Sequence, residues 1–84
     1  MAKILYRVMQ DGNRVLFESE NLQDALDYMQ EAYEELDKDY ICHLTDKGWC
    51  MSVHHPKTVA VVTTLKIKVI DEREKHLNGI ILKF

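Results

Sequence analysis

The chain has 84 residues, of which 46% are hydrophobic and 30% are charged, and its formal net charge is −3. Such a length predicts one small domain with a thin core, and the apolar content is too high for a disordered acidic tail. No apolar run approaches the roughly 20 residues that a membrane-spanning helix needs. Two cysteines are too few for the disulfide framework of a secreted mini-protein, so we expect a cytoplasmic protein with reduced thiols.

The first part of the chain predicts a β-hairpin made of Ile4–Gln10 and residues 14–18. The Asp-Gly dipeptide at 11–12 can supply the positive φ values of a two-residue type I′ turn. This turn would place Val8 opposite Val15. The resulting register gathers five apolar side chains on one face: Ile4, Tyr6, Val8, Val15 and Phe17. Three further apolar side chains would lie on the other face: Leu5, Met9 and Leu16.

The next segment predicts an amphipathic helix that begins at Asn21. Asn21 is a favourable N-cap, and Asp24 can complete a capping box three residues later. The apolar residues that follow recur at the spacing of one helical face: Leu22, Ala25, Leu26, Met29, Ala32, Tyr33 and Leu36. We expect this apolar stripe to pack against the sheet.

The second half of the chain predicts further strands. Residues 40–45 and 49–54 are expected to pair around a turn at 46–48, and residues 58–70 are rich in the β-branched residues typical of strands. A polar connection at 71–78, with one possible helical turn, would lead to a short last strand at 80–84. The order ββαβββ(β) predicts an α+β fold, in which an antiparallel sheet of five or six strands carries one helix on one face.

Acidic residues are concentrated around the predicted helix. Residues 18–39 contain nine acids and one base, a net of −8, whereas the other residues contain five acids and ten bases, a net of +5. Five carboxylates cluster on the helix face opposite the apolar stripe: Asp24, Asp27, Glu31, Glu34 and Glu35. Their like-charge pairs at i,i+3 and i,i+4 would together cost about 1–2 kcal/mol at low salt. We expect no nearby lysine to relieve this repulsion.

Two interpretations of the acidic face remain open. Charge runs are often no more than a solvated helix face. The same carboxylates could instead form an electrostatic docking surface that attracts a basic partner and accelerates the encounter. Mimicry of nucleic acid is an extreme form of the second interpretation, but the positive remainder of the chain argues against it.

Three residues of the second hairpin could in principle carry chemistry. A three-residue loop would place Cys42, Cys50 and His54 on one side of the sheet, and zinc favours such ligands. Structural zinc sites usually need four ligands with close cysteine pairs, a spacing that this chain lacks. Cys50 and His54 could form a nucleophilic pair, but no orienting acid accompanies them. We therefore predict no catalytic residue, no metal and no cofactor.

Lys66 and Lys68 form a short basic face on a predicted strand. Binding of nucleic acid would require a larger basic patch than two lysines. Lysines on a strand are more typical of a sheet edge that is protected against aggregation. We therefore expect no direct binding of nucleic acid and none of a membrane.

The sequence predicts a non-enzymatic protein-binding module, an inhibitor or modulator that uses the acidic helix face to dock on a host or cellular protein with a basic surface. In its general form, a small α+β chain with an acidic helix, it resembles accessory proteins of phages and mobile elements that bind and inhibit host proteins; no motif carries this resemblance. Two alternatives remain: a structural homo-oligomer such as a homodimer, suggested by Leu5, Met9 and Leu16, and a small Cys/His metalloprotein or enzyme.

Overall fold

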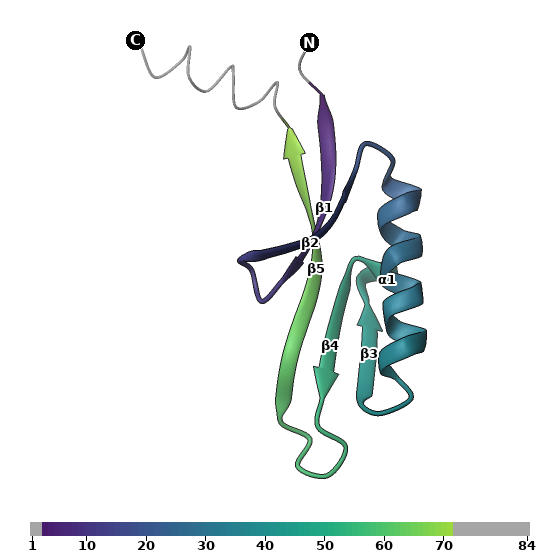
Figure 1. Cartoon of the computed structure of the whole chain (residues 1–84), viewed down its shortest axis with the longest axis vertical. Coiled ribbons are helices and arrows are strands. Elements are labelled where there is room, and N and C mark those ends of the chain that lie inside the picture. Colours follow the sequence, from purple (N-terminus) through teal and green to yellow (C-terminus); the bar gives the residue numbers. More distant parts are fainter. Residues whose placement is uncertain (1–2, 72–84) are drawn as a thin grey trace.

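The computed structural model describes residues 3–71 as an antiparallel sheet with one helix packed on it (Figure 1). The five strands lie in the order β2-β1-β5-β4-β3, so β2 and β3 form the edges and β5 lies at the centre. The helix α1 contacts β1, β2, β3 and β4. The elements are β1 Ile4–Gln10, β2 Arg14–Ser19, α1 Leu22–Leu36, β3 Ile41–Thr45, the short 3₁₀ helix η1 Asp46–Gly48, β4 Cys50–His54 and β5 Val61–Asp71.

This architecture confirms the predicted α+β fold, with a five-stranded sheet in the described residues. The predicted polar connection at 71–78 reaches beyond the described residues, and the predicted last strand at 80–84 lies outside them.

The core lies between α1 and one face of the sheet. Eight apolar residues are buried there: Val8, Ala25, Met29, Cys42, Met51, Val53, Leu65 and Ile67. The predicted helical stripe is confirmed, because Ala25 and Met29 are buried and four other members pack half-buried against the core: Leu26, Ala32, Tyr33 and Leu36. The remaining member, Leu22, is half-buried. Within residues 3–71 no helix covers the opposite face of the sheet, which we call the open face.

The turn of the first hairpin has the predicted backbone, but its register differs. Asp11 and Gly12 have φ values of 53° and 79°. A bulge in β2 then lets Val8 pair with Phe17, whereas Val15 pairs with Met9 and is 47% exposed. The predicted pairing of Val8 with Val15 is therefore wrong. The bulge moves Val15 off the core face and leaves its neighbour Leu16 packed against the core, so the prediction that Leu16 lies on the other face is wrong.

The helix begins at the predicted N-cap, but the capping network uses an additional residue. The Asn21 side chain accepts a hydrogen bond from the backbone N–H of Gln23 at 2.8 Å. Asp24 does not reach back to Asn21; instead the Ser19 hydroxyl accepts from the Asn21 backbone N–H and donates to the Asp24 carboxylate, both at 3.0 Å. Ser19 thus connects the backbone of Asn21 to the side chain of Asp24, two groups that would contact each other directly in a capping box.

The second hairpin forms as predicted, but its connection is four residues long. Thr45 pairs with Cys50, so Cys42 pairs with Val53 on the core face and is 7% exposed. Because side chains alternate along a strand, Cys50 and His54 lie on the open face. The prediction that Cys42, Cys50 and His54 share one side of the sheet is therefore wrong.

The long strand β5 begins at Val61 rather than at residue 58, because a loop precedes it. The backbone N–H of His55 donates to the carbonyl of Ala60, and that of Val59 donates to the carbonyl of His55, both at 2.9 Å. Val59 has a φ of 62°, which is unusual for a β-branched residue. These contacts close the chain into a tight loop, and pairing with β4 resumes only at Val61.

Candidate functional site

The acidic face of α1 comprises the five carboxylates that the sequence places opposite the apolar stripe. All five are exposed on the helix: Asp24, Asp27, Glu31, Glu34 and Glu35. The apolar side of α1 is fixed on the sheet by Ala25 and Met29, so the carboxylates project from the other side of a helix whose orientation is set by the core.

Three of these carboxylates accept hydrogen bonds from uncharged side chains. The Ser19 hydroxyl donates to Asp24 at 3.0 Å. The amide nitrogens of Gln23 and Gln30 donate to Asp27 at 2.9 Å and to Glu34 at 3.3 Å, respectively. These contacts hold the carboxylates in place without neutralising their charge.

Glu35 and Glu31 differ from these three. Glu35 forms an ion pair with Lys38 at 3.2 Å, so the prediction that no lysine relieves the acidic face is wrong at this position. Both side chains are mostly exposed, which limits the contribution of the pair. Glu31 has no hydrogen bond or ion pair within residues 3–71. Four of the five carboxylates therefore have no basic partner in the described part of the chain.

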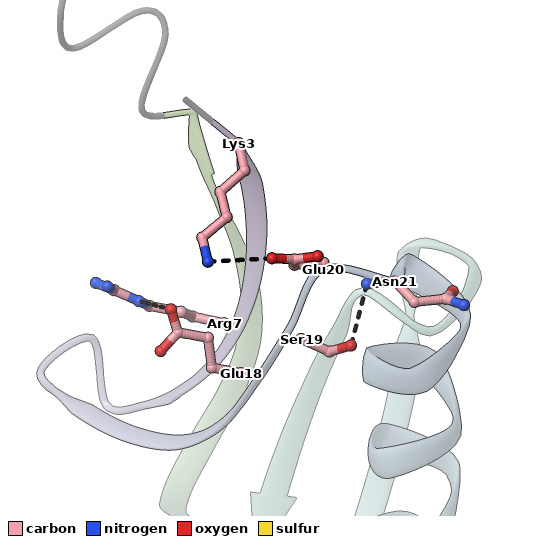
Figure 2. A network of polar contacts seen from close by, with 6 residues as sticks. All are labelled: Lys3, Arg7, Glu18, Ser19, Glu20 and Asn21. Atoms are coloured by element: carbon pink, nitrogen blue, oxygen red, sulfur yellow. Dashed lines mark hydrogen bonds and ion pairs between the residues drawn. The ribbon is translucent and has the colours of Figure 1, made fainter. Parts of the chain in front are cut away.

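Two bases near the start of the chain are engaged elsewhere. Lys3 contacts Glu20 at 3.1 Å and Arg7 contacts Glu18 at 3.3 Å. Figure 2 shows the Arg7–Glu18 pair on the side of the strands that faces away from α1. The sheet therefore supplies no counter-charge to the acidic face through these pairs.

Shallow grooves flank the acidic face on both sides. A cavity of about 200 Å³ lies toward β2 and is lined by Phe17, Asp24, Asp27, Tyr28 and Glu31. The rings of Phe17 and Tyr28 stack there, with centroids 5.0 Å apart. A cavity of about 520 Å³ lies toward β3 and η1, and Asp27 lines it too. The first groove combines three carboxylates with an aromatic surface, which suits a cationic side chain.

Sequence reasoning did not identify Phe17 and Tyr28 as part of this surface. Tyr28 stands four residues after Asp24 and therefore next to it on the helix, which is a usable signal. The position of Phe17 depends on the bulge in β2, so its proximity could not be read from the sequence.

The cysteines and histidines do not form a metal site within residues 3–71, where no three metal-ligating side chains come together. Cys42 lies on the core face, and both cysteines are free thiols. Burial, together with the nearby carboxylate of Asp37, raises the pKa of the Cys42 thiol. His54 contacts the carbonyl of Val59 at 3.1 Å and the hydroxyl of Ser52 at 3.0 Å, so one ring nitrogen contacts the β4–β5 loop and the other contacts β4 itself.

The position of Lys66 contradicts its interpretation as a residue that protects a sheet edge. Lys66 and Lys68 both belong to β5, but β4 pairs with this strand only as far as Lys66, so Lys66 lies between β1 and β4 whereas Lys68 pairs with β1 alone. Protection of an edge strand therefore cannot explain Lys66, whereas at Lys68 one side of β5 has no strand partner within residues 3–71.

Comparisons of the chain with protein-family models, with curated proteins and with solved structures give no match. Among residues 3–71, no helix combines the length and the apolar character that crossing a membrane requires.

Proposed function

We propose that the protein is a non-enzymatic binding module that docks on a basic surface of a host or cellular protein through the acidic face of α1. The observation that carries the proposal is the uncompensated charge: four of the five carboxylates on this face have no basic partner within residues 3–71. An exposed row of like charges creates a field that steers a basic partner toward the surface.

The groove beside Phe17 and Tyr28 supports the same proposal. A lysine or arginine of the partner could contact the aromatic rings while the carboxylates of Asp24, Asp27 and Glu31 neutralise its charge. The module would act as an inhibitor or modulator in the cytoplasm, in the manner of accessory proteins of phages and mobile elements. Binding would occupy the basic surface of the partner and would require no chemistry from this chain.

A charge-matched pair of variants tests the proposal. Glu31→Gln with Glu34→Gln removes two charges from the acidic face, and Asp39→Asn with Asp46→Asn removes two from segments outside the helix. Affinity capture from cells of the native source, followed by mass spectrometry, should recover a basic partner with the wild type and the control but not with the helix variant. Equal recovery by both variants would show that the face does not carry the interaction.

A homodimer is the second candidate, and exposed apolar side chains favour it. Val15, Val61 and Val62 are 47%, 59% and 50% exposed. Val15 pairs with Met9 of β1, and Met9 pairs on its other side with Lys66 of β5. A second copy could cover such side chains. Sedimentation equilibrium distinguishes the two candidates, because a monomer at about 1 mM protein would exclude a dimer of useful affinity.

A further inference from the structure

A cavity of about 470 Å³ lies beside the first hairpin, away from the acidic face of α1. It is lined by Met9, Gly12, Thr64, Lys66, Ile67 and Lys68. Figure 1 shows the turn of the β1–β2 hairpin projecting on the side of the sheet opposite to α1. The cavity thus lies between this turn and the central strand β5, and we call it the basic cavity.

The wall of the basic cavity is fixed by the hydrogen bonds of Asp11. The backbone N–H of Asp11 donates to the carbonyl of Thr64 at 2.9 Å. The carboxylate of Asp11 accepts from the Thr63 hydroxyl and from the Thr64 backbone N–H, both at 3.0 Å. The turn is therefore attached to β5, and Asp11 directs a carboxylate oxygen to the strand.

The basic cavity carries positive charge that the described residues do not neutralise. Lys66 and Lys68 are exposed, and neither side chain has a hydrogen bond or ion pair within residues 3–71. Lys68 also pairs directly with Arg7 of β1. Like charges directly opposite one another destabilise a sheet. Glu18 contacts Arg7 at 3.3 Å, which leaves the two lysines without a counter-ion in the described part of the chain.

We propose that the basic cavity binds the phosphate group of a small organic phosphate of nucleotide size. Lysines bind phosphate as point charges, and Lys66 and Lys68 lie on the same side of one strand. The Thr64 hydroxyl adds a hydrogen-bond donor, and Met9 adds an adaptable apolar surface for the organic part of the ligand. The volume falls within the range of about 300–1,000 Å³ that is typical of small-molecule sites.

A small phosphate suits the basic cavity better than a nucleic-acid backbone does. The two lysines of this cavity occupy only one stretch of β5, whereas a polynucleotide needs a longer basic track. The net charge of the chain is −3, and the field of α1 would oppose a long polyanion. The proposal concerns residues outside α1, so it does not depend on the docking function.

Nuclear magnetic resonance titration of ¹⁵N-labelled protein tests the proposal with four probes: inorganic phosphate, adenosine monophosphate, adenosine and sodium chloride at matched ionic strength. We expect saturable shifts of the amides of Met9, Gly12, Thr64, Lys66 and Lys68 with both phosphates. Adenosine monophosphate should bind about tenfold more tightly than inorganic phosphate, because its organic part adds contacts. Sodium chloride and adenosine should give no saturable shift.

Two lysine variants with the same change of charge complete the test. Lys66→Gln with Lys68→Gln should weaken binding of adenosine monophosphate by about tenfold or more. Lys47→Gln with Lys57→Gln, at exposed positions outside the basic cavity, should leave it unchanged. A dispersed spectrum without ligand verifies the fold of each variant.

Several results would overturn the proposal. They are the absence of saturable shifts with either phosphate up to about 10 mM, equal affinity in both double variants, or an equal response to sodium chloride. If adenosine monophosphate binds no more tightly than inorganic phosphate, the ligand is not an organic phosphate. Tighter binding of a single-stranded oligonucleotide, with a steep dependence on salt, would identify a nucleic-acid site instead.

Discussion

Asp11 is the residue that joins the first hairpin to the centre of the sheet. Its φ of 53° is tolerated by aspartate and asparagine better than by most other residues. Its carboxylate accepts two hydrogen bonds, one from Thr63 and one from Thr64, and its backbone N–H donates a third to the carbonyl of Thr64. One side chain therefore combines a turn conformation with a contact across more than fifty positions of sequence.

Replacement of this side chain should reveal its contribution. We expect Asp11→Ala to lower the free energy of unfolding by about 1–3 kcal/mol, because it removes the acceptor and strains the positive φ. Asp11→Asn keeps an oxygen acceptor and tolerates the same φ, so it should lower the free energy by less than half as much. Urea denaturation measures both variants, and equal losses would show that the acceptor does not matter.

Cys42 links the core to the pH dependence of stability. Burial first, and the carboxylate of Asp37 second, raise the pKa of its thiol from the ordinary value of 9.0. The folded protein therefore holds this proton more tightly than the unfolded chain does. The resulting contribution to stability is fully present below pH 9 and is lost as the pH rises through the higher pKa of the folded state.

Two alanine variants isolate this contribution. Between about pH 8 and pH 10.5, the free energy of unfolding of the wild type should fall more steeply than that of Cys42→Ala. Cys50→Ala serves as the control for the loss of a thiol, because Cys50 lies on the open face. Denaturation with guanidinium across this range provides the measurement. A parallel slope in Cys42→Ala would refute the assignment.

At the scale of elements, α1 combines a stabilising and a destabilising face. The stripe anchored by Ala25 and Met29 attaches the helix to the sheet. On the other side, Glu31 belongs to like-charge pairs with Asp27, Glu34 and Glu35, and no base contacts it within residues 3–71. Packing therefore has to offset a repulsion that the helix sequence itself creates.

Neutralisation of the acidic face should therefore stabilise the protein. We expect Glu31→Gln with Glu34→Gln to raise the free energy of unfolding by about 1 kcal/mol at low salt, because three like-charge pairs disappear. The gain should shrink as sodium chloride is added and screens the exposed charges. Thermal denaturation at two salt concentrations measures the effect. A loss of stability at low salt would mean that the hydrogen bond from Gln30 to Glu34 outweighs the repulsion.

The elements show which signals in the sequence determine structure locally. The 3.6-residue period of α1 predicted the helix and its buried stripe, and the Asp-Gly dipeptide at 11–12 predicted the turn conformation, because both depend on neighbouring residues. Two other features depend on packing against other elements. They are the bulge that moves Val15 off the core face and the four-residue connection of the hairpin in which Cys42 lies on the core face. One additional residue in a bulge or a connection places every later side chain of the strand on the opposite face of the sheet.

At the scale of the whole molecule, the strand order determines how individual residues are interpreted. Lys66 and Lys68 resemble edge residues in the sequence, but β5 pairs with β1 along both residues and with β4 as far as Lys66, which places Lys66 in the interior of the sheet. Strand order arises from contacts between segments far apart in the chain, which no local pattern encodes. The basic cavity therefore became recognisable only in the folded structure, whereas the acidic residues of α1 were visible in the sequence.

The folded molecule separates its charges onto different surfaces. The acidic face of α1 lies on the outer side of the helix, and Lys66, Lys68 and Arg7 belong to the two central strands β5 and β1. Because the sheet and the core lie between these groups, each surface can attract a ligand of the opposite charge. We therefore expect substitutions at one surface to leave binding at the other unchanged.

The most direct test of the docking function is the association rate constant of the captured partner, measured by stopped-flow fluorescence at about 50 mM and 200 mM salt. The wild type and Asp39→Asn with Asp46→Asn should associate rapidly at low salt and slow down steeply at high salt. Glu31→Gln with Glu34→Gln should associate several-fold more slowly at low salt, with a weaker dependence on salt. Equal rate constants and equal salt dependence in all three proteins would contradict the role of the acidic face.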